Sequence, residues 1–251
     1  MIESVNNEKI VYFKKLRDKK FILSEGKFIV EGDHLITEAY KSGLLLEVIT
    51  SDESLNIWNS KCTLVSKKCL EKISLLKSTP SVMGVVKLKM NNDIIGDKIV
   101  LLDNVQDPGN IGTIIRSALA FNVSTVILSP DSVNVFNDKL IRSTEGTIFN
   151  MNVVVMDLKE AISVLKSRGI KTYYADMNGT LDLDDARVDK YGLVLGSEGK
   201  GISSYIKEIC DEGISIPMND KCESLNVSVT GGIIMYKFRW FYGLSVCRET
   251  C

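Results

Sequence analysis

Residues 107–118, DPGNIGTIIRSA, place an asparagine and an arginine shortly after a strongly apolar run. The run at 99–102 predicts a buried strand, and Asp107-Pro108-Gly109 predicts a turn. Asn110 is expected to cap the following helix, with Arg116 about one and a half turns further along on its polar side. Open α/β sheets bind ligands at the carboxyl ends of their strands, so both side chains are candidate site residues. The alternative is a surface arginine on an amphipathic helix.

A second stretch, LVLGSEGKGI at 193–202, ends a predicted buried strand in a loop with three glycines and one carboxylate, Glu198. Glycines there permit positive φ and let a ligand approach the backbone closely. A phosphate-binding P-loop is excluded, because Gly196 to Lys200 lacks the GxxxxGK[ST] spacing. Taken alone, a plain glycine-rich turn explains this stretch equally well.

The third stretch is ISIPMNDKCESLNVSVTGG at 214–232. It predicts a strand ending near Pro217, a polar loop, and a helix with Ser224 as its N-cap. The early part of this helix carries the small residues Ser228, Gly231 and Gly232. Such residues lower helix propensity, so they predict close packing against another segment or a subunit.

The elements that must position these stretches alternate regularly from residue 98 onward. Predicted strands cover 98–105, 125–128, 153–155, 171–175, 192–195 and 213–217. Predicted helices cover 110–121, 137–143, 158–168 and 225–242. Strands that are apolar on both faces and separated by helices indicate an α/β domain whose parallel sheet is covered on both sides.

The front of the chain repeats this rhythm on a smaller scale. Predicted helices cover 6–20, 35–42 and 67–75, and predicted strands cover 27–31, 46–50, 62–65 and 81–88. Polar turn formers at 91–97 interrupt the pattern. We therefore expect a small α/β domain at 1–96 and a second domain at 97–251.

The front domain is mildly basic, with 15 Lys and Arg against 12 Asp and Glu in residues 1–95. Its first predicted helix carries a lysine cluster that includes Lys14, Lys15, Lys19 and Lys20. Such clusters favour contacts with the phosphate backbone of RNA. The alternative is a solvated lysine face.

The composition, with 45% hydrophobic and 25% charged residues, is that of a soluble globular protein. The six cysteines have no CxxC spacing, and the one histidine, His34, is far from them in sequence. This argues against a zinc site and for reduced thiols. Neither a signal peptide nor an apolar run of membrane-spanning length is visible, so we expect no membrane association and a cytoplasmic location.

In order, the three stretches resemble the signature motifs of the SpoU/TrmH family of RNA ribose 2′-O-methyltransferases, within the SPOUT superfamily. The resemblance covers about residues 97–242. The front domain, with FIVEGDHLITEA at 28–39 and STPSVMGVVKL at 78–88, is similar to the family's small RNA-binding domain. The resemblance implies a deep trefoil knot, which general rules of chain connectivity would exclude. It also implies a homodimer through the knotted domain, S-adenosylmethionine (AdoMet) as cofactor, and no metal.

The resemblance also assigns roles to matching positions. It implies catalytic roles for Asn110, Arg116, Glu198, Ser224 and Asn226. It implies cofactor contacts for Leu195, Gly196, Glu198, Gly201, Ile216, Met218, Ser224, Leu225 and Asn226. Arg116 matches the proposed catalytic arginine, but arginine stays protonated and is a poor base, so holding an RNA phosphate and orienting the 2′-hydroxyl is the alternative.

The leading hypothesis is therefore an AdoMet-dependent methyltransferase that acts on a ribose 2′-hydroxyl in RNA, with ribosomal RNA favoured by the extra front domain. The alternatives are a transfer-RNA methyltransferase, an antibiotic-resistance methyltransferase of the same family, and a non-catalytic RNA-binding or ribosome-assembly factor on this fold. A nicotinamide-dependent oxidoreductase is remote, because no GxGxxG follows any predicted strand. The RNA, its nucleotide and whether it must be part of a ribosomal particle are not visible in the sequence.

Overall fold

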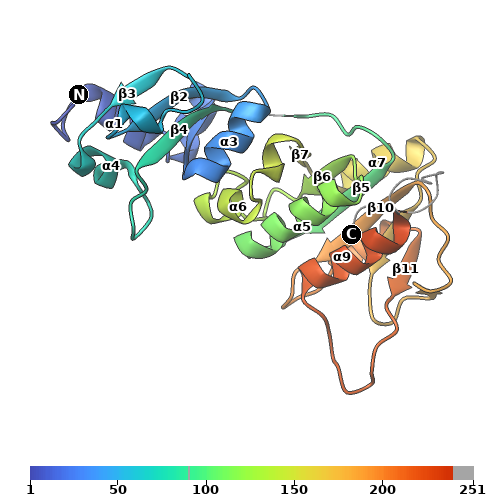
Figure 1. Ribbon diagram of the computed structural model, residues 1–251. Helices are drawn as coiled ribbons and strands as arrows, with labels where there is room; N and C mark the ends of the chain where they lie inside the picture. Colours follow the sequence, from blue (N-terminus) through green and yellow to red (C-terminus); the bar gives the residue numbers. More distant parts are fainter. Residues whose placement is uncertain (90, 240–251) are drawn as a thin grey trace, which may run out of the picture. The chain divides into compact units, whose positions relative to one another are not determined.

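The computed structural model describes residues 1–89 and 91–239. The chain divides into two compact units (Figure 1). Of the described residues, unit 1 contains those in 1–91 together with 134–150, and unit 2 contains 92–133 together with 151–239. No helix in the described ranges is long and apolar enough to cross a membrane.

Unit 1 is built on a sheet whose strand order is β1-β4-β2-β3. The strands are β1 (Lys27–Glu31), β2 (Leu45–Thr50), β3 (Cys62–Leu64) and β4 (Val82–Lys87). The helices are α1 (Glu8–Lys15), α2 (Lys19–Glu25), α3 (Asp33–Lys41), α4 (Lys67–Ile73) and α6 (Asp138–Ser143), with short 3-10 turns at Glu53–Leu55 and Thr147–Phe149. Successive strand residues point to opposite faces, so Ile29 packs with α1 and α4 while Phe28 and Val30 pack with α3 and α6.

Unit 2 contains a sheet whose described strands pair in parallel in the order β7-β6-β5-β10-β8-β11-β9. The strands are β5 (Lys98–Asp103), β6 (Thr125–Leu128), β7 (Asn152–Val155), β8 (Thr172–Ala175), β9 (Leu181–Asp182), β10 (Tyr191–Gly196) and β11 (Glu212–Ser215). The helices are α5 (Pro108–Ala120), α7 (Leu158–Ser167), α8 (Ser204–Ile209) and α9 (Val227–Phe238). The predicted α/β class with a parallel sheet is confirmed.

Both faces of this sheet are covered, as predicted. Helices α7 and α8 pack on one face, against a core that includes Leu101 and Val194. Helices α5 and α9 lie side by side (Figure 1). A Cβ atom at Gly231 of α9 would lie 2.7 Å from Leu195 Cδ1, so this glycine permits the close approach of α9 to β10. The close packing predicted for Gly231 is therefore confirmed, whereas a Cβ at Gly232 would meet only Ser117 Oγ, at 3.8 Å.

One predicted helix is wrong, because residues 6–20 form two helices. Helix α1 ends before Leu16, and Asp18 adopts an extended conformation with φ −86° and ψ 131°. The Asp18 carboxylate accepts hydrogen bonds from the backbone N–H groups of Lys20 and Phe21. An aspartate that caps a new helix in this way cannot continue the previous one. Helix α8 and strand β9 were not predicted, and residues 240–242 of the last predicted helix lie outside the described residues.

The observed division also differs from the predicted boundary after residue 96. The helix predicted at 137–143 is present as α6, but its segment, residues 134–150, packs in unit 1. Ile141 and Phe149 of this segment are buried in the same core as Phe28 of β1. Burial of apolar side chains against the unit 1 sheet explains why a segment between two strands of unit 2 belongs to the other unit.

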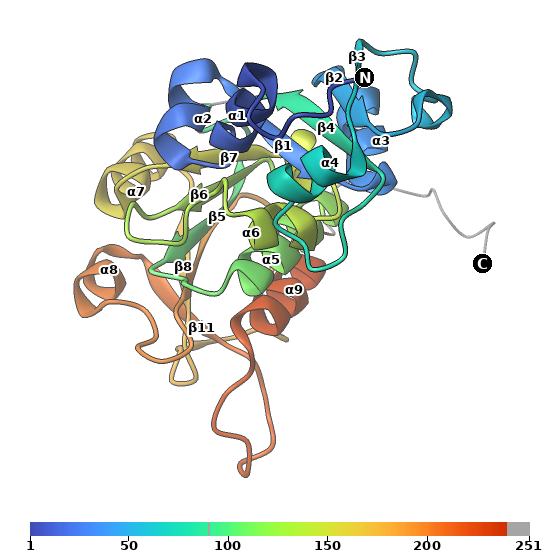
Figure 2. The same ribbon diagram turned by 90° about the vertical axis from the view of Figure 1, so that its left-hand side faces the viewer.

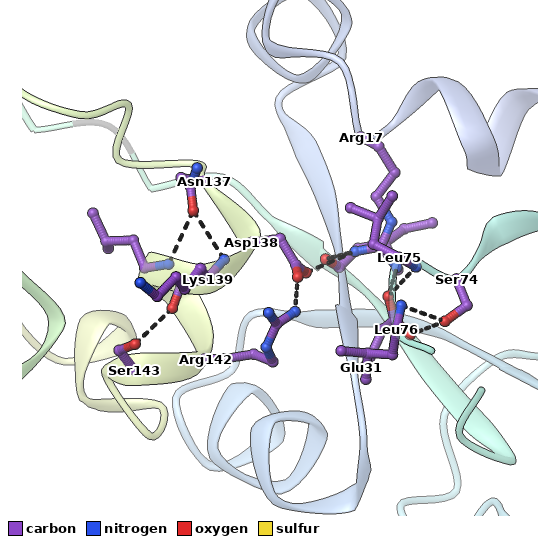
Figure 3. Close-up of polar contacts among 12 residues, drawn as sticks. Arg17, Glu31, Ser74, Leu75, Leu76, Asn137, Asp138, Lys139, Arg142 and Ser143 are labelled. Carbon is purple, nitrogen blue, oxygen red and sulfur yellow. Dashed lines mark hydrogen bonds and ion pairs between the residues drawn. The ribbon is translucent and has the colours of Figure 1, made fainter. Parts of the chain in front are cut away.

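A buried polar cluster ties the same segment to the rest of unit 1 (Figure 3). Arg17 forms ion pairs with Glu31 at 2.5 Å and with Asp138 at 3.3 Å. Glu31 also accepts hydrogen bonds from Ser74 Oγ at 2.6 Å and from the backbone N–H of Leu75 at 3.0 Å. The cluster therefore joins four parts of unit 1: the α1–α2 connection, the end of β1, the loop after α4, and helix α6. Arg17 contacts β1 and α6, and Glu31 contacts the loop after α4.

Candidate active site

A cavity of about 470 Å³ lies in unit 2 at the carboxyl ends of β8, β10 and β11. Its volume is within the range of pockets that enclose small molecules. All the residues predicted to contact a cofactor line it: Leu195, Gly196, Glu198, Gly201, Ile216, Met218, Ser224, Leu225 and Asn226. The structure therefore brings the second and third stretches of the sequence together around one cavity.

The glycine-rich loop after β10 folds back on itself to form one wall of this cavity. The backbone N–H of Gly201 donates to the carbonyl of Ser197 at 2.8 Å, and Gly201 has a positive φ of 66°. A Cβ atom at Gly196 would lie 2.3 Å from the carbonyl carbon of Gly201. Gly196 is thus required by the close approach of the chain's own backbone, which the sequence alone does not distinguish from the approach of a ligand.

A buried carboxylate holds the far end of this loop. Asp103, the last residue of β5, is 1% exposed and accepts hydrogen bonds from the backbone N–H and the hydroxyl of Ser203, both at 2.7 Å. Ser203 is the residue before α8. The contact fixes where the loop leaves the cavity, and sequence reasoning missed it because the two residues are far apart in the chain.

Asn110, Glu198 and Asn226 form a polar triad beside the cavity. Asn110 Nδ2 donates to Glu198 Oε1 at 2.6 Å, and Asn226 Nδ2 donates to the same oxygen at 2.6 Å. Asn226 Nδ2 also lies 3.0 Å from Asn110 Oδ1. The triad joins all three sequence stretches, one residue from each. Two amide donors on one oxygen are suited to an ionised carboxylate, which only accepts.

Helix capping fixes the orientation of Asn226 within the triad. Its Oδ1 accepts from the backbone N–H of Ser228 at 2.9 Å and from the Ser228 hydroxyl at 2.6 Å. Because the oxygen caps α9, the amide nitrogen must face Glu198. The N-cap of α9 is therefore Asn226, and the prediction that Ser224 caps this helix is wrong; Ser224 lies in the preceding loop and lines the cavity.

The predicted cap of α5 is wrong in a similar way. Asp107 is the N-cap, and its carboxylate accepts from the backbone N–H of Asn110 at 2.9 Å. Pro108 is the first helical residue, a position where its missing N–H costs nothing. Asn110 lies within the first turn, so its side chain is free of a capping role and contacts Glu198 instead.

Arg116 lies in α5 with an exposed side chain and is not part of the cavity lining. It makes no hydrogen bond or ion pair with any residue in the described ranges. The structure thus does not bring Arg116 to the triad. Its guanidinium donors are available to a ligand on the surface of unit 2.

The predicted RNA-binding lysines lie in unit 1 and are all exposed. Lys14 and Lys15 end α1, and Lys19 and Lys20 begin α2. None of the four forms an ion pair with a carboxylate of the described chain. Lys9 of the same cluster differs, because it pairs with Glu47 at 2.8 Å and is partly neutralised.

Two charged residues that line the cavity, Asp176 and Lys207, were not predicted as site residues. Asp176 directly follows β8, so it carries the same signal as the other site residues, a polar side chain at a strand end. Within the described residues, no group of three or more His, Cys, Asp or Glu side chains is arranged to hold a metal ion.

Comparison with known proteins places this geometry in a family. Residues 97–236 match the SpoU rRNA Methylase family, and residues 7–84 match the MRM3-like substrate binding domain. The chain is 32% identical over 244 residues to the 23S rRNA (guanosine(2553)-2′-O)-methyltransferase RlmP of Bacillus subtilis, covering 95% of this chain and 98% of that protein. It is 30% identical over 182 residues to the 23S rRNA (adenosine(1067)-2′-O)-methyltransferase of Streptomyces laurentii, covering 69% and 67% of the two chains.

Solved structures agree. A protein of the TrmH family from Porphyromonas gingivalis superposes with a TM-score of 0.85 at 26% identity, covering 94% of this chain and 98% of that one. The SpoU methyltransferase AviRb from Streptomyces viridochromogenes, solved in complex with AdoMet, shares the fold with a TM-score of 0.81 at 24% identity, covering 93% and 97%. The chain belongs to the SpoU rRNA methylase family.

Proposed function

We propose that this protein transfers a methyl group from AdoMet to a ribose 2′-hydroxyl of 23S ribosomal RNA. The observation that carries the proposal is the triad of Asn110, Glu198 and Asn226 at the edge of the strand-end cavity. Family membership and two relatives whose names specify 2′-O-methylation of 23S rRNA support the reaction and the substrate.

The residues around the cavity fit AdoMet. The wall formed by Gly196 and Gly201 exposes backbone groups to a planar base, and Leu195, Ile216 and Leu225 supply apolar contacts. Glu198 brings a negative charge that suits a sulfonium cation. Bound there, AdoMet would supply an electrophilic methyl group, so the protein's main work is to align the ribose hydroxyl with it.

The chain's own residues divide this work. With AdoMet bound, the ribose oxygen would take the methyl carbon, the electron pair of the broken sulfur–methyl bond would stay on sulfur, and the hydroxyl proton would pass to water. Asn110 and Asn226, held by Glu198, position the ribose and the cofactor end, and Ser224 lies close enough to the cavity to contact RNA. Arg116 holds an RNA phosphate and orients the 2′-hydroxyl, a role that suits a permanently protonated group better than proton removal.

The proposal includes RNA contact by unit 1. Lys14, Lys15, Lys19 and Lys20 present four exposed positive charges in two consecutive helices, which suits an RNA phosphate backbone. We place the reaction in the cytoplasm, where ribosomal RNA is available.

We also propose a homodimer formed through unit 2. Helix α9 exposes an apolar stripe at helical spacing, with Val229 at 47%, Ile233 at 38% and Tyr236 at 54% exposure. The exposed loop between β11 and α9 extends away from its own sheet (Figure 2). Sedimentation tests the dimer: Tyr236→Lys is expected to give a monomer, whereas Tyr40→Lys, at a similarly exposed tyrosine of unit 1, should not.

The family resemblance adds a trefoil knot in the C-terminal part of unit 2. It is supported by the position of β11, which lies between β8 and β9 although it follows both in the chain. The turn at Gly179 also crosses the β11 backbone closely: a Cβ there would lie 2.5 Å from the carbonyl carbon of Ile214. A crystal structure tests the knot. A backbone path that would become a straight line if its two ends were drawn apart would contradict it.

The function is tested by mapping 2′-O-methylated nucleotides in total RNA from cells with and without the gene. We expect the loss of one modified position in 23S rRNA, restored by the wild-type protein. Loss of a position in transfer RNA instead would indicate a tRNA enzyme. An unchanged map, together with no heat of AdoMet binding in calorimetry, would indicate a non-catalytic RNA-binding factor.

A further inference from the structure

The strongest further feature is an ion pair inside the cavity. Asp176, in the turn after β8, and Lys207, in α8, both line the cavity and bond to each other through Asp176 Oδ2 and Lys207 Nζ. Their side chains are 20% and 36% exposed. This pair is separate from the triad and none of the three sequence stretches contains Asp176.

The backbone holds Asp176 firmly in place. Its N–H donates to the carbonyl of Ile214 at 3.0 Å, and its own carbonyl accepts from Gly179 at 3.0 Å. Asp176 Oδ1 accepts from the backbone N–H of Asn178 at 2.9 Å. Burial raises the pKa of Asp176, but the bonds from Lys207 and Asn178 outweigh it and leave the pKa below its usual value. The carboxylate is therefore ionised and preorganised at neutral pH.

The two carboxylates that line the cavity differ in their partners. Glu198 accepts from neutral amides and pairs with no cation among the described residues, so its negative charge is uncompensated. The charge of Asp176 is compensated by Lys207. A cationic ligand group next to Asp176 would be repelled by the neighbouring ammonium, whereas neutral hydroxyl donors would not be. Asp176 also keeps acceptor capacity, because a carboxylate has about four acceptor sites and the described residues donate to two of them.

We propose that Asp176 accepts hydrogen bonds from the ribose hydroxyls of the cofactor, and that Lys207 is a positioning residue that keeps this carboxylate ionised and oriented. The inference rests on the proposed use of AdoMet. A carboxylate that accepts from a ribose diol is a general solution to nucleoside binding, used in other α/β folds at the end of a strand. Glu198, whose charge is not paired with a cation among the described residues, would then suit the cationic groups of the cofactor.

The test uses the full-length protein and calorimetric competition with four ligands. S-adenosylhomocysteine and 5′-methylthioadenosine both carry the ribose, but only the first carries the amino-acid group. Adenosine and 2′,3′-dideoxyadenosine differ only in the two hydroxyls. We expect the wild-type protein to bind adenosine roughly tenfold or more tightly than 2′,3′-dideoxyadenosine, because hydrogen bonds to a charged acceptor are worth about 1.5–3 kcal/mol, or 10–100-fold in affinity. In Asp176→Ala the two ligands should bind equally well.

The outcomes are distinct. Equal losses for S-adenosylhomocysteine and 5′-methylthioadenosine in Asp176→Ala would support the ribose contact. A loss for S-adenosylhomocysteine alone would overturn it in favour of the amino-acid group, and unchanged affinities would show no contact. If the wild-type protein binds none of the four ligands, the proposed function fails rather than the assignment of Asp176.

A lysine variant separates positioning from folding. In Lys207→Met the ammonium group no longer lowers the pKa of Asp176, so this carboxylate takes up a proton at higher pH. Affinity for adenosine is therefore expected to fall more steeply than in the wild type as pH decreases toward 5. Lys166→Met is the matched control, because Lys166 pairs with Asp211 at 3.1 Å and does not line the cavity. The same pH profile for both variants would overturn the role of Lys207.

Discussion

Asn226 donates an amide N–H to Glu198 Oε1 at 2.6 Å while its own amide oxygen caps α9. The carboxylate receives a second amide N–H from Asn110, which lies in the first turn of α5. One oxygen of Glu198 therefore connects the starts of two neighbouring helices to the glycine-rich loop of the cavity. We therefore expect a change at any of the three residues to affect the position of the other two.

Replacing Glu198 tests this connection. In Glu198→Ala both asparagine amides lose their acceptor, and we expect kcat to fall about 10–100-fold, the value of hydrogen bonds to a charged group. Glu198→Gln retains a carbonyl oxygen of similar size and should lose less. Methyl transfer from radiolabelled AdoMet to 23S rRNA measures both variants. Equal activity of Glu198→Ala and wild type would show that the triad does not contribute to catalysis.

Arg116 should separate RNA alignment from cofactor binding. Because it is exposed on α5 and outside the cavity, Arg116→Ala is expected to abolish methyl transfer while AdoMet affinity stays nearly unchanged. Arg116→Lys keeps the charge but loses the planar fork, so it should recover only part of the activity. Calorimetry and single-turnover transfer give the two readouts, and comparable turnover in Arg116→Ala would rule out the role.

The lysines of α1 and α2 should control the salt dependence of RNA binding. Neutralising Lys14, Lys15, Lys19 and Lys20 is expected to weaken binding and to flatten the slope of log affinity against log salt concentration, because fewer counterions are released. An unchanged slope would mean that the lysines are merely solvated. The control neutralises four exposed lysines of unit 2: Lys159, Lys166, Lys171 and Lys190.

Two glycines of the cavity loop form a matched pair. In Gly196→Ala the new Cβ would lie 2.3 Å from the backbone of Gly201, so the loop must shift. We expect lower AdoMet affinity and a free energy of unfolding reduced by about 1–3 kcal/mol. In Gly199→Ala the Cβ meets no atom within 4 Å, so both quantities should stay near wild type. Similar behaviour of the two variants would contradict the close approach.

The sequence predicts the parallel sheet of unit 2 well, because strands such as 99–102 and 193–195 are apolar on both faces and most of the strands alternate with helical patterns. Nine of the cavity-lining residues are predicted by the family resemblance of the second and third stretches, whereas Asp176 and Lys207, which lie outside those stretches, are not. The helix caps were predicted less well: an asparagine or serine near a helix start is a candidate cap, and only the fold shows that Asp107 and Asn226 take these roles. Asp18 is a similar case, since its capping of α2 depends on the chain's turn after α1.

The placement of residues 134–150 was beyond sequence reasoning for a different reason. Local patterns show that α6 is a helix, but not which sheet buries Ile141 and Phe149. That choice depends on contacts with residues more than a hundred positions earlier in the chain. The pairing of Arg17 with Asp138 is part of the same long-range choice.

This pairing leads to a prediction about stability. The side chain of Glu31 is fully buried and that of Arg17 is 9% exposed, so Arg17→Met would leave a buried carboxylate without its cation. Removing one partner of a buried pair costs about 3–5 kcal/mol, and here we expect the lower end, because Ser74 and Leu75 still donate to Glu31. Urea unfolding followed by circular dichroism measures the loss.

Two controls make the cause identifiable. Lys41→Met breaks the pair of Lys41 with Glu38, whose side chains are 64% and 23% exposed, and should cost under about 1 kcal/mol. The double variant Arg17→Met/Glu31→Gln replaces the buried charge with a neutral amide that can still accept from Leu75, so it should be more stable than Arg17→Met alone. A double variant no more stable than the single one would show that Arg17 acts through its packing and its contacts with α6 rather than by neutralising Glu31.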